Sequence, residues 1–480
     1  MRDRFYMNGL VIGIIILFIG ISIIPSISGN TSGKNEVVNG DPKANEVTRD
    51  VIFSDDFNDY IKSYSKWTVM YYMCGDSDMD ILISPLLENL SKIGSSKDLN
   101  IVALKDNLGK GNSKLYYFDE SGNKIELNDV YGWPDEVNMN DLHILELFCT
   151  QMMEFYPANH YALITYTSAG TGWQEFCLVD KDTTGEKIST PDFAYCLKNI
   201  TNNVNHKIDV LFVSCAMSTI ELAYEIFPYV DYIVGTQDCF TEKSIVPRFS
   251  EAVWDLRNNT DMNPEEFSGR APYRFEPEPF YYKEGYGEEL PLLCKILNKL
   301  PFKGLHTVVH YPSSSVLNLS KINELANKLD NLSLNLIANL KDLKFKEGIR
   351  RARSETQEYS RCYPKYWLLF QIYKRYPLNI LAYDCVIDLY NFIEILRYYV
   401  DNDLIKNQCN SILEFYEEVI SAIKKISYDN SNGLNIYFPT RKIMYNKYLF
   451  NKGIPCLYED LQFSKDTSWD EFLRAYLKTV

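Results

Sequence analysis

YALITYTSAGTGW, residues 161–173, and DVLFVSCAM, residues 209–217, are the two stretches that decide the fold of this chain. Each begins with a short apolar run and ends in small or polar residues. Such runs, rich in β-branched and aromatic residues, are typical of strands buried on both faces of a parallel sheet. Similar runs lie before and after them: WTVMYYM (67–73), NIVALK (100–105), KLYYF (114–118), YIVGT (232–236) and HTVVHY (306–311).

Segments of helix length separate several of these runs, at 139–155, 191–200 and 217–227. Alternating strands and helices predict an α/β fold with a mainly parallel sheet flanked by helices. Residues 66–260 are therefore the predicted α/β core.

The chain after the core divides into two parts. Residues 261–290 are rich in Pro, Glu and Tyr, which predicts a long surface loop. Residues 291–480 are predicted to be helix-rich, most clearly at 383–400, where apolar residues recur at the spacing of a one-sided helix packed on a core. A late strand at 432–439 and a closing helix from near Ser468 complete this part.

The N-terminus has the pattern of an export signal. Arg2 and Arg4 precede the apolar run 10–24, and small residues follow it, so residues 1–29 are predicted to be a secretory signal. Counted as 10–27, the run approaches the length of a membrane span, which leaves an uncleaved anchor as the alternative, and a buried core helix as a third. The polar segment 30–65 is a predicted stalk. We expect an extracellular or cell-surface protein, either secreted or N-terminally anchored.

Composition excludes several classes of function. The chain is 46% hydrophobic and 24% charged, as in globular proteins, and its net charge of −15 without a cluster of Lys or Arg argues against nucleic acid as a partner. Five histidines, no HExxH and no pair of CxxC motifs predict no metal site, and the absence of GxxxxGK[ST] argues against a nucleotide cofactor. Eleven cysteines without tight spacing predict no disulfide scaffold, and the odd number leaves at least one thiol unpaired within a monomer.

Two strand ends carry residues suited to chemistry. Functional groups of a parallel sheet collect just past the carboxyl ends of its strands, where the loops diverge. Gly170 and Gly172 would let backbone N–H groups approach a ligand, although tight turns use glycine in the same way. Cys215 follows a strand and precedes a helix expected from near Met217, a place where a thiolate is favoured, although a buried cysteine with no reactivity is the commoner case.

At these residues the chain resembles the clostripain family of cysteine peptidases, relatives of the caspases and gingipains. The resemblance runs from Trp67 nearly to Val480. The stretches that carry it are WTVMYYMCGDSDMD (67–80), LVDKDTTGEKISTPDFAYCL (178–197), SCAMSTIELAYEIFPYVDYIVGTQD (214–238), YDCVIDLYNFIEIL (383–396), NGLNIYFP (432–439) and YEDLQFSKDTSWDEFL (458–473). The resemblance implies a caspase-like sheet and a Cys–His dyad that hydrolyses peptide bonds, often after Arg or Lys.

The family's functional positions are only partly kept. Its nucleophile falls on Cys215, but its HGSGW motif corresponds to AGTGW here, which puts Ala169, or Ser168 with a one-residue gap, at the position of the catalytic His. Val213 stands where the family has the Asp of the pocket for basic side chains. The resemblance therefore implies weak or no peptidase activity, with Gly170 and Gly172 beside the retained crevice.

The other histidines offer poor substitutes. His160 and His206 precede the two strands, at the opposite edge of the sheet from Cys215, while His143 is expected within a helix and His306 at a strand start. His310, at a strand end, is the least implausible replacement.

Three functions stay open. The leading one is a degenerate peptidase that binds a peptide or protein in the crevice and needs no cofactor. The second is an active cysteine endopeptidase with a rebuilt dyad and no preference for Arg or Lys, and the third is a structural envelope protein in which Cys215 is part of the core.

Overall fold

The computed structural model of the protein describes residues 64–77, 79–167, 172–176, 178, 180, 188–238, 242–275, 280–281, 309–310, 313–359, 386–425, 430–440, 442, 445–446 and 456–478. They belong to one compact unit, Phe57–Val480. The predicted signal at 1–29, the span at 10–27 and nearly all of the predicted stalk at 30–65 lie outside the described residues. Ser65 was expected to end the stalk, but it is buried and begins the first strand.

In the described part of the chain, nine strands form one sheet in the order β12-β10-β7-β6-β5-β1-β2-β3-β4. The central strands are parallel to one another: β7 (Val230–Gly235), β6 (Ile208–Phe212), β5 (Ala158–Tyr166), β1 (Ser65–Gly75) and β2 (Leu99–Asn107). Antiparallel strands border them on both sides: β10 (Ser314–Asn318), β12 (Ile420–Lys424), β3 (Lys114–Phe118) and β4 (Lys124–Glu126). The expected α/β fold with a mainly parallel sheet is confirmed.

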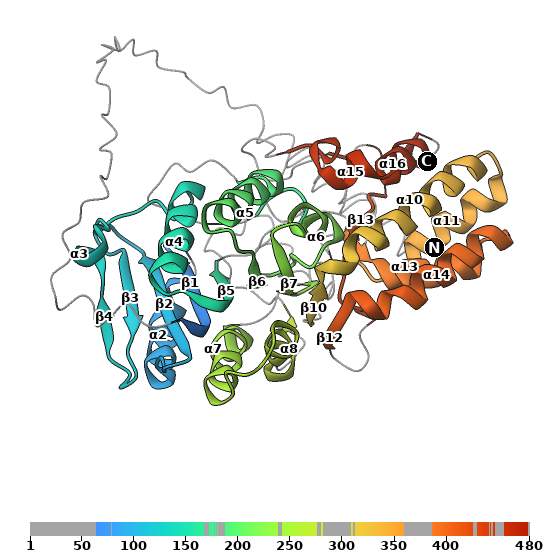
Figure 1. Ribbon diagram of the computed structural model, residues 1–480. Coiled ribbons are helices and arrows are strands. Elements are labelled where there is room, and N and C mark those ends of the chain that lie inside the picture. The colour runs from blue at the N-terminus through green and yellow to red at the C-terminus, as the bar shows by residue number, and fades with distance from the viewer. Residues whose placement is uncertain are drawn as a thin grey trace, which may run out of the picture. The chain divides into compact units, whose positions relative to one another are not determined.

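Helices cover both faces of the sheet because side chains alternate between two apolar clusters along each buried strand. On β1, Met70 and Tyr72 belong to one cluster, whereas Val69 and Tyr71 belong to the other. The second cluster is closed by α2 (Asp80–Ile93), α7 (Glu242–Asn258) and α8 (Pro264–Arg274). The first is closed by α4 (Leu142–Phe155), α5 (Thr190–Val204), α6 (Ile220–Ile226) and α10 (Ile322–Asn339), so the two groups lie on opposite sides of the sheet (Figure 1).

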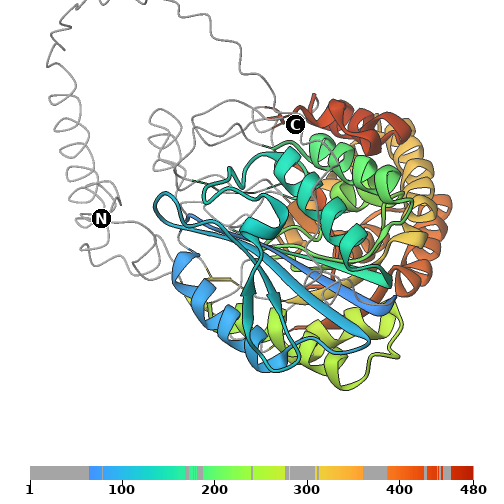
Figure 2. The same cartoon turned by 60° about the vertical axis from the view of Figure 1, so that its left-hand side comes forward.

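The C-terminal part is rich in helices, as expected, and extends the first cluster. Its helices are gathered on one side of the unit (Figure 2). They are α11 (Leu343–Glu355), α13 (Leu389–Tyr399), α14 (Asp403–Val419), α15 (Gln462–Asp466) and α16 (Trp469–Leu477); the short α3 (Asn128–Tyr131) lies elsewhere, after β4. The helix expected from near Ser468 is confirmed as α16.

The predicted surface loop at 261–290 is wrong for its first part, because Pro264–Arg274 form α8. Asn263 caps this helix: its side chain accepts a hydrogen bond from Glu266 N, and the Glu266 carboxylate accepts one from Asn263 N, each at 3.0 Å. Pro264 then occupies the first turn, where its missing N–H costs nothing. Phe267 and Ala271 are buried against the sheet. The proline and glutamate that suggested a loop are thus a helix start.

Two further expectations need correction. The helix predicted at 383–400 begins only at Leu389, because Val386–Asp388 form strand β11, which pairs with β13 (Asn435–Tyr437), the late strand of the sequence. Asp388 then caps α13 by accepting a hydrogen bond from Asn391 N at 2.7 Å. Of the run 306–311, Val309–His310 form β9, which pairs with β8 (Phe280–Tyr281) in a separate two-stranded sheet rather than in the main one.

Candidate functional site

Cys215 lies on a turn just past the carboxyl end of β6. The Ser214 hydroxyl donates a hydrogen bond to Thr167 O at 2.7 Å, which ties this turn to the end of β5. Ala216 has a positive φ of 59°, and its N–H donates to the Thr236 hydroxyl at 3.2 Å. Among the cysteines that the structure describes, Cys215 is a free thiol and is the one that is not buried. The thiol therefore lies at the carboxyl edge of the sheet and is partly exposed.

The loop that follows β5 packs directly against this turn. The Thr219 hydroxyl donates a hydrogen bond to Gly172 O at 2.6 Å. Gly172 has a φ of 81°, and a Cβ at this position would lie 2.8 Å from Ala216 O. The structure thus places Gly172 against the turn that carries Cys215. Ser168, Ala169 and Gly170 lie outside the described residues.

The helix after Cys215 begins later than expected. Helix α6 starts at Ile220 rather than near Met217, and Thr219 is its N-cap, accepting a hydrogen bond from Leu222 N at 3.2 Å. Cys215 therefore precedes the cap residue and does not open the helix. The Val213 side chain, at the predicted substrate-binding position, is fully buried in the apolar core.

Two histidines lie at the other edge of the sheet, as predicted. His160 Nδ1 is 2.8 Å from Asp209 Oδ1, and His206 Nδ1 is 3.9 Å from the other carboxylate oxygen. His160 is paired with Trp67 near the start of β1, and at about 3.3 Å per residue the carboxyl end of β5 is about 20 Å away. These groups are structural partners of Asp209 and do not reach Cys215.

The remaining histidines are placed as follows. His143 is exposed in the first turn of α4 rather than in the middle of a helix. His310 is described by its backbone alone, in β9, and His306 lies outside the described residues.

A buried cluster beside the site was not foreseen from the sequence. The Trp173 ring lies 4.7 Å from the Tyr437 ring and 5.2 Å from the Tyr458 ring. Glu221, on α6, accepts hydrogen bonds from Tyr437 N and from the Tyr458 hydroxyl, both at 2.8 Å. Burial raises the pKa of the Glu221 carboxyl to about 7. The loop after β5, the helix after Cys215 and the C-terminal part are therefore held together by one set of contacts.

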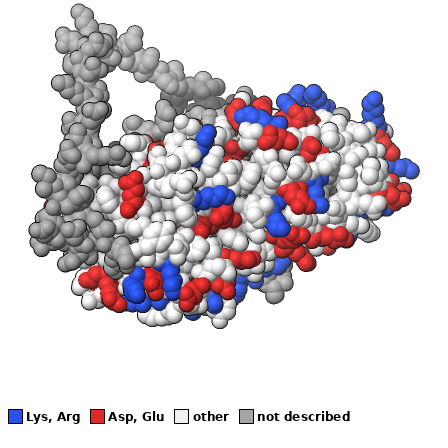
Figure 3. Space-filling view, viewed as in Figure 1, with Lys and Arg blue, Asp and Glu red and all other residues white. Residues whose placement is uncertain are grey.

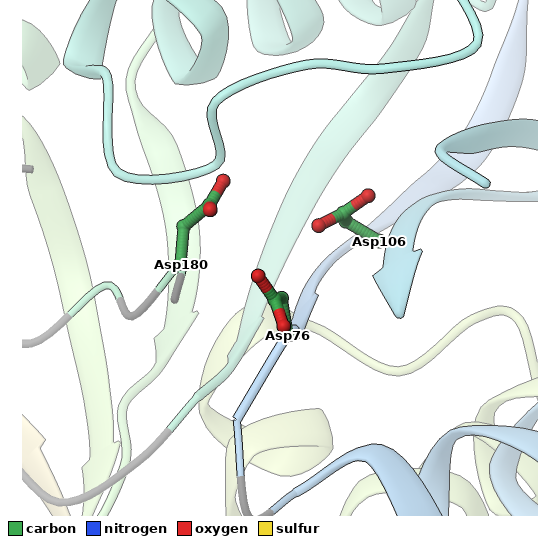
Figure 4. A group of neighbouring side chains, drawn as sticks. All are labelled: Asp76, Asp106 and Asp180. Carbon is green, nitrogen blue, oxygen red and sulfur yellow. The ribbon is translucent and has the colours of Figure 1, made fainter. Parts of the chain in front are cut away.

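Three buried aspartates form a second unforeseen group at the carboxyl edge of the sheet. Asp76 follows β1, Asp106 lies near the end of β2, and Asp180 follows the loop after β5; one oxygen from each lies within 4.8 Å of the others (Figure 4). Burial raises the pKa of Asp106 to about 7, although the Ser113 hydroxyl donates to it at 2.6 Å. Carboxylate oxygens at this spacing are the ligands that Ca²⁺ and Mg²⁺ prefer, so these residues could hold a hard cation. A check of which acidic residues follow the predicted strands would have found Asp76 and Asp106.

The surface in view mixes charges of both signs (Figure 3). Lys114, for example, lies 2.7 Å from carboxylate oxygens of both Glu126 and Asp135. Among the described residues, no helix combines the length and the apolar character that a membrane span requires.

A family model matches the part of the chain that carries this site. Residues 71–242, which include both loops of the site, match the model of the clostripain family, Peptidase C11. No curated protein sequence matches the chain.

Solved structures extend the likeness beyond this segment. An inactive zymogen C11 protease from Parabacteroides distasonis is 16% identical, with a TM-score of 0.54 over 85% of this chain and 99% of that chain. The secreted C11 cysteine protease iotapain from Bacteroides thetaiotaomicron is 11% identical, with a TM-score of 0.50 over 86% and 100% of the two chains. A secreted C11 cysteine protease of that organism, in complex with an irreversible peptide inhibitor, is 15% identical, with a TM-score of 0.48 over 86% and 99%. Over residues 71–242 the chain is therefore similar to the clostripain family, and it shares the fold of C11 proteases of known structure.

Proposed function

We propose that this protein is an exported pseudopeptidase: it binds a peptide or protein segment beside Cys215 and hydrolyses amide bonds weakly or not at all. One observation carries the proposal. Cys215 is a partly exposed thiol on a turn, and Ala169 stands at the family's histidine position. His160 is bonded to Asp209 at the opposite edge of the sheet, and His206 lies beside the same carboxylate.

Amide hydrolysis needs a group, such as the family's histidine, that delivers a proton to the leaving amine. A thiolate can attack a carbonyl carbon, but the leaving amine must also receive a proton, and a positioned acid contributes about 10²- to 10⁴-fold to such a step. Alanine and serine cannot carry that proton near neutral pH. If the amine cannot leave, attack by Cys215 stops at a tetrahedral adduct that returns to the thiol and the intact peptide, so the site binds a peptide without cleaving it.

The surroundings of the thiol support retained binding. Thr219 still links the turn after Cys215 to Gly172, and Glu221 still anchors the C-terminal part beneath it. A protein that had lost all use of this edge would have no need of a partly exposed cysteine there, because burial or replacement would protect it from oxidation. The buried side chain of Val213 supplies no charge, so we expect no preference for Arg or Lys in the ligand.

The test uses the purified full chain after export and a diverse peptide library. Wild type and C215A should cleave no peptide at a peptidase rate, whereas A169H should gain cleavage that C215A abolishes in the double variant. A169N is the matched control: its side chain is of similar size but does not act as an acid or base near pH 7, so the variant should stay inactive.

Two results count against the proposal. Cys215-dependent cleavage by wild type, at roughly 1 s⁻¹ or faster, would establish the active endopeptidase with a rebuilt dyad instead. Failure of both wild type and C215A to retain any peptide of the library would remove the binding half and favour a structural role for the thiol.

A further inference from the structure

Arg248 is a fully buried arginine beneath the turn that carries Cys215. It lies on α7, and its guanidinium donates hydrogen bonds to Val213 O at 3.2 Å and to Val234 O at 2.8 Å. Val234 O also accepts a hydrogen bond from Val213 N at 3.0 Å. The guanidinium therefore joins the carboxyl ends of β6 and β7, two residues before the thiol.

The same contacts bring a positive charge close to Cys215. Burial lowers the pKa of Arg248 to about 10, and a negative charge at Cys215 would raise this pKa. Phe249, the next residue on α7, belongs to the apolar cluster against which Cys215 packs. At neutral pH the guanidinium keeps its charge in this apolar setting, where a charge acts more strongly than it does in water.

The charged groups that the structure describes at the ends of neighbouring strands do not replace it. Asp76 after β1 and Asp238 after β7 are carboxyl groups, whose negative charge opposes a thiolate. Lys105, on β2, donates instead to Asn107 Oδ1 and Asn112 O, at 2.7 and 2.5 Å. Helix α6 begins at Ile220, so Cys215 does not lie next to its first residue as the sequence suggested.

We propose that Arg248 is a positioning residue for Cys215: its guanidinium fixes the end of β6 before the turn and supplies the positive charge that favours the thiolate. Arg248 on α7 would thus favour the thiolate in place of the N-terminus of α6, which lies on the opposite side of the sheet. The proposal rests on the proposed function only in taking Cys215 as the functional thiol, and it holds whether or not peptides are cleaved.

The test measures how fast iodoacetamide alkylates Cys215 in the folded full chain, followed by mass spectrometry of the peptide that contains it. The readout is the rate at pH 7 divided by the rate at pH 10, because a purely structural role would not change this ratio. R248M and R248Q should lower the ratio about 10-fold, because loss of a positive charge at short range reduces the fraction of thiolate at pH 7 by about that factor. R248Q keeps a donor for the two carbonyls, and R248K, which keeps the charge, should stay within about 3-fold of wild type.

The matched control is Arg353, another buried arginine, which donates to Phe438 O at 2.7 Å and forms an ion pair with Glu358 at 2.8 Å. R353M should destabilise the fold without changing the ratio. A ratio that is unchanged in R248M and R248Q, or one that falls equally in R353M, overturns the proposal.

A second measurement avoids any loss of folding in the arginine variants. If Arg248 favours the thiolate, wild type should gain stability relative to C215S as the pH rises from 7 to 9, because the folded state then holds a thiolate that the serine cannot provide. The unfolding free energies come from urea titrations of both proteins. A difference between them that is the same at both pH values also overturns the proposal. Peptide cleavage enters neither measurement, so failure here is distinct from failure of the proposed function.

Discussion

Replacing Gly172 with alanine probes the close packing of the two loops at the site. The new Cβ would lie 2.8 Å from Ala216 O, and closer still to the Thr219 methyl group. Gly172 also has a φ of 81°, a backbone conformation that residues with a side chain rarely adopt. The substitution therefore meets two separate obstacles, one within its own backbone and one from its neighbours.

The expected loss can be estimated from these two effects. A left-handed backbone costs about 1 kcal/mol or more once a Cβ is present, and a forced contact in a packed region costs about 1–3 kcal/mol. We expect G172A to lower the unfolding free energy by about 2–4 kcal/mol. Because Ala216 must move to relieve the contact, the rate of Cys215 alkylation should also change several-fold.

Gly132 provides the matched control. Its φ of 72° is similar, but a Cβ added there would have no neighbour within 4 Å, so G132A should lose only the backbone part, about 1 kcal/mol. Urea unfolding followed by tryptophan fluorescence measures both variants, and Trp173 lies next to the substitution. If G172A loses no more than G132A and leaves Cys215 alkylation unchanged, the loops do not pack as described.

Three further outcomes follow from the structure. Glu221→Gln should flatten the pH dependence of stability, because burial raises the pKa of Glu221 in the folded state from 4.5 to about 7. The wild-type folded state keeps this proton to higher pH than the unfolded state, so its unfolding free energy falls by about 3 kcal/mol as the pH rises from 4.5 to 7. Urea titrations measure this fall, and an equal fall in wild type and variant would contradict the prediction. Thr219→Val should lower the unfolding free energy by about 1–2 kcal/mol, since the hydroxyl both caps α6 and donates to Gly172 O, and Thr219→Ser should restore most of it. Asn263→Ala should lower the unfolding free energy by about 1 kcal/mol, because α8 loses its cap. Unchanged thermal and urea unfolding would indicate that this segment is a surface loop instead.

The sequence could predict the central strands because their pattern is local. Apolar runs such as 161–167 and 209–213 are buried on both faces, and burial of that kind depends on residue type and spacing alone. The same reasoning places Cys215 and Gly172 past two strand ends, since parallel neighbours end at the same edge. The edge strands β10 and β12 were not predicted, because a short run such as Ser314–Asn318 becomes a strand only through pairing with β7.

What the sequence alone determined is the α/β sheet and the place of Cys215 just past a strand end, because strand burial and residue identity are properties of the chain itself. Tertiary structure decided the surroundings of the thiol. Arg248 comes to Val213, Glu221 to Tyr437 and Tyr458, and Asp76 to Asp106 and Asp180 only when distant segments pack together. The charges and hydrogen bonds that act on a group come from its neighbours in space, which no spacing along the sequence records.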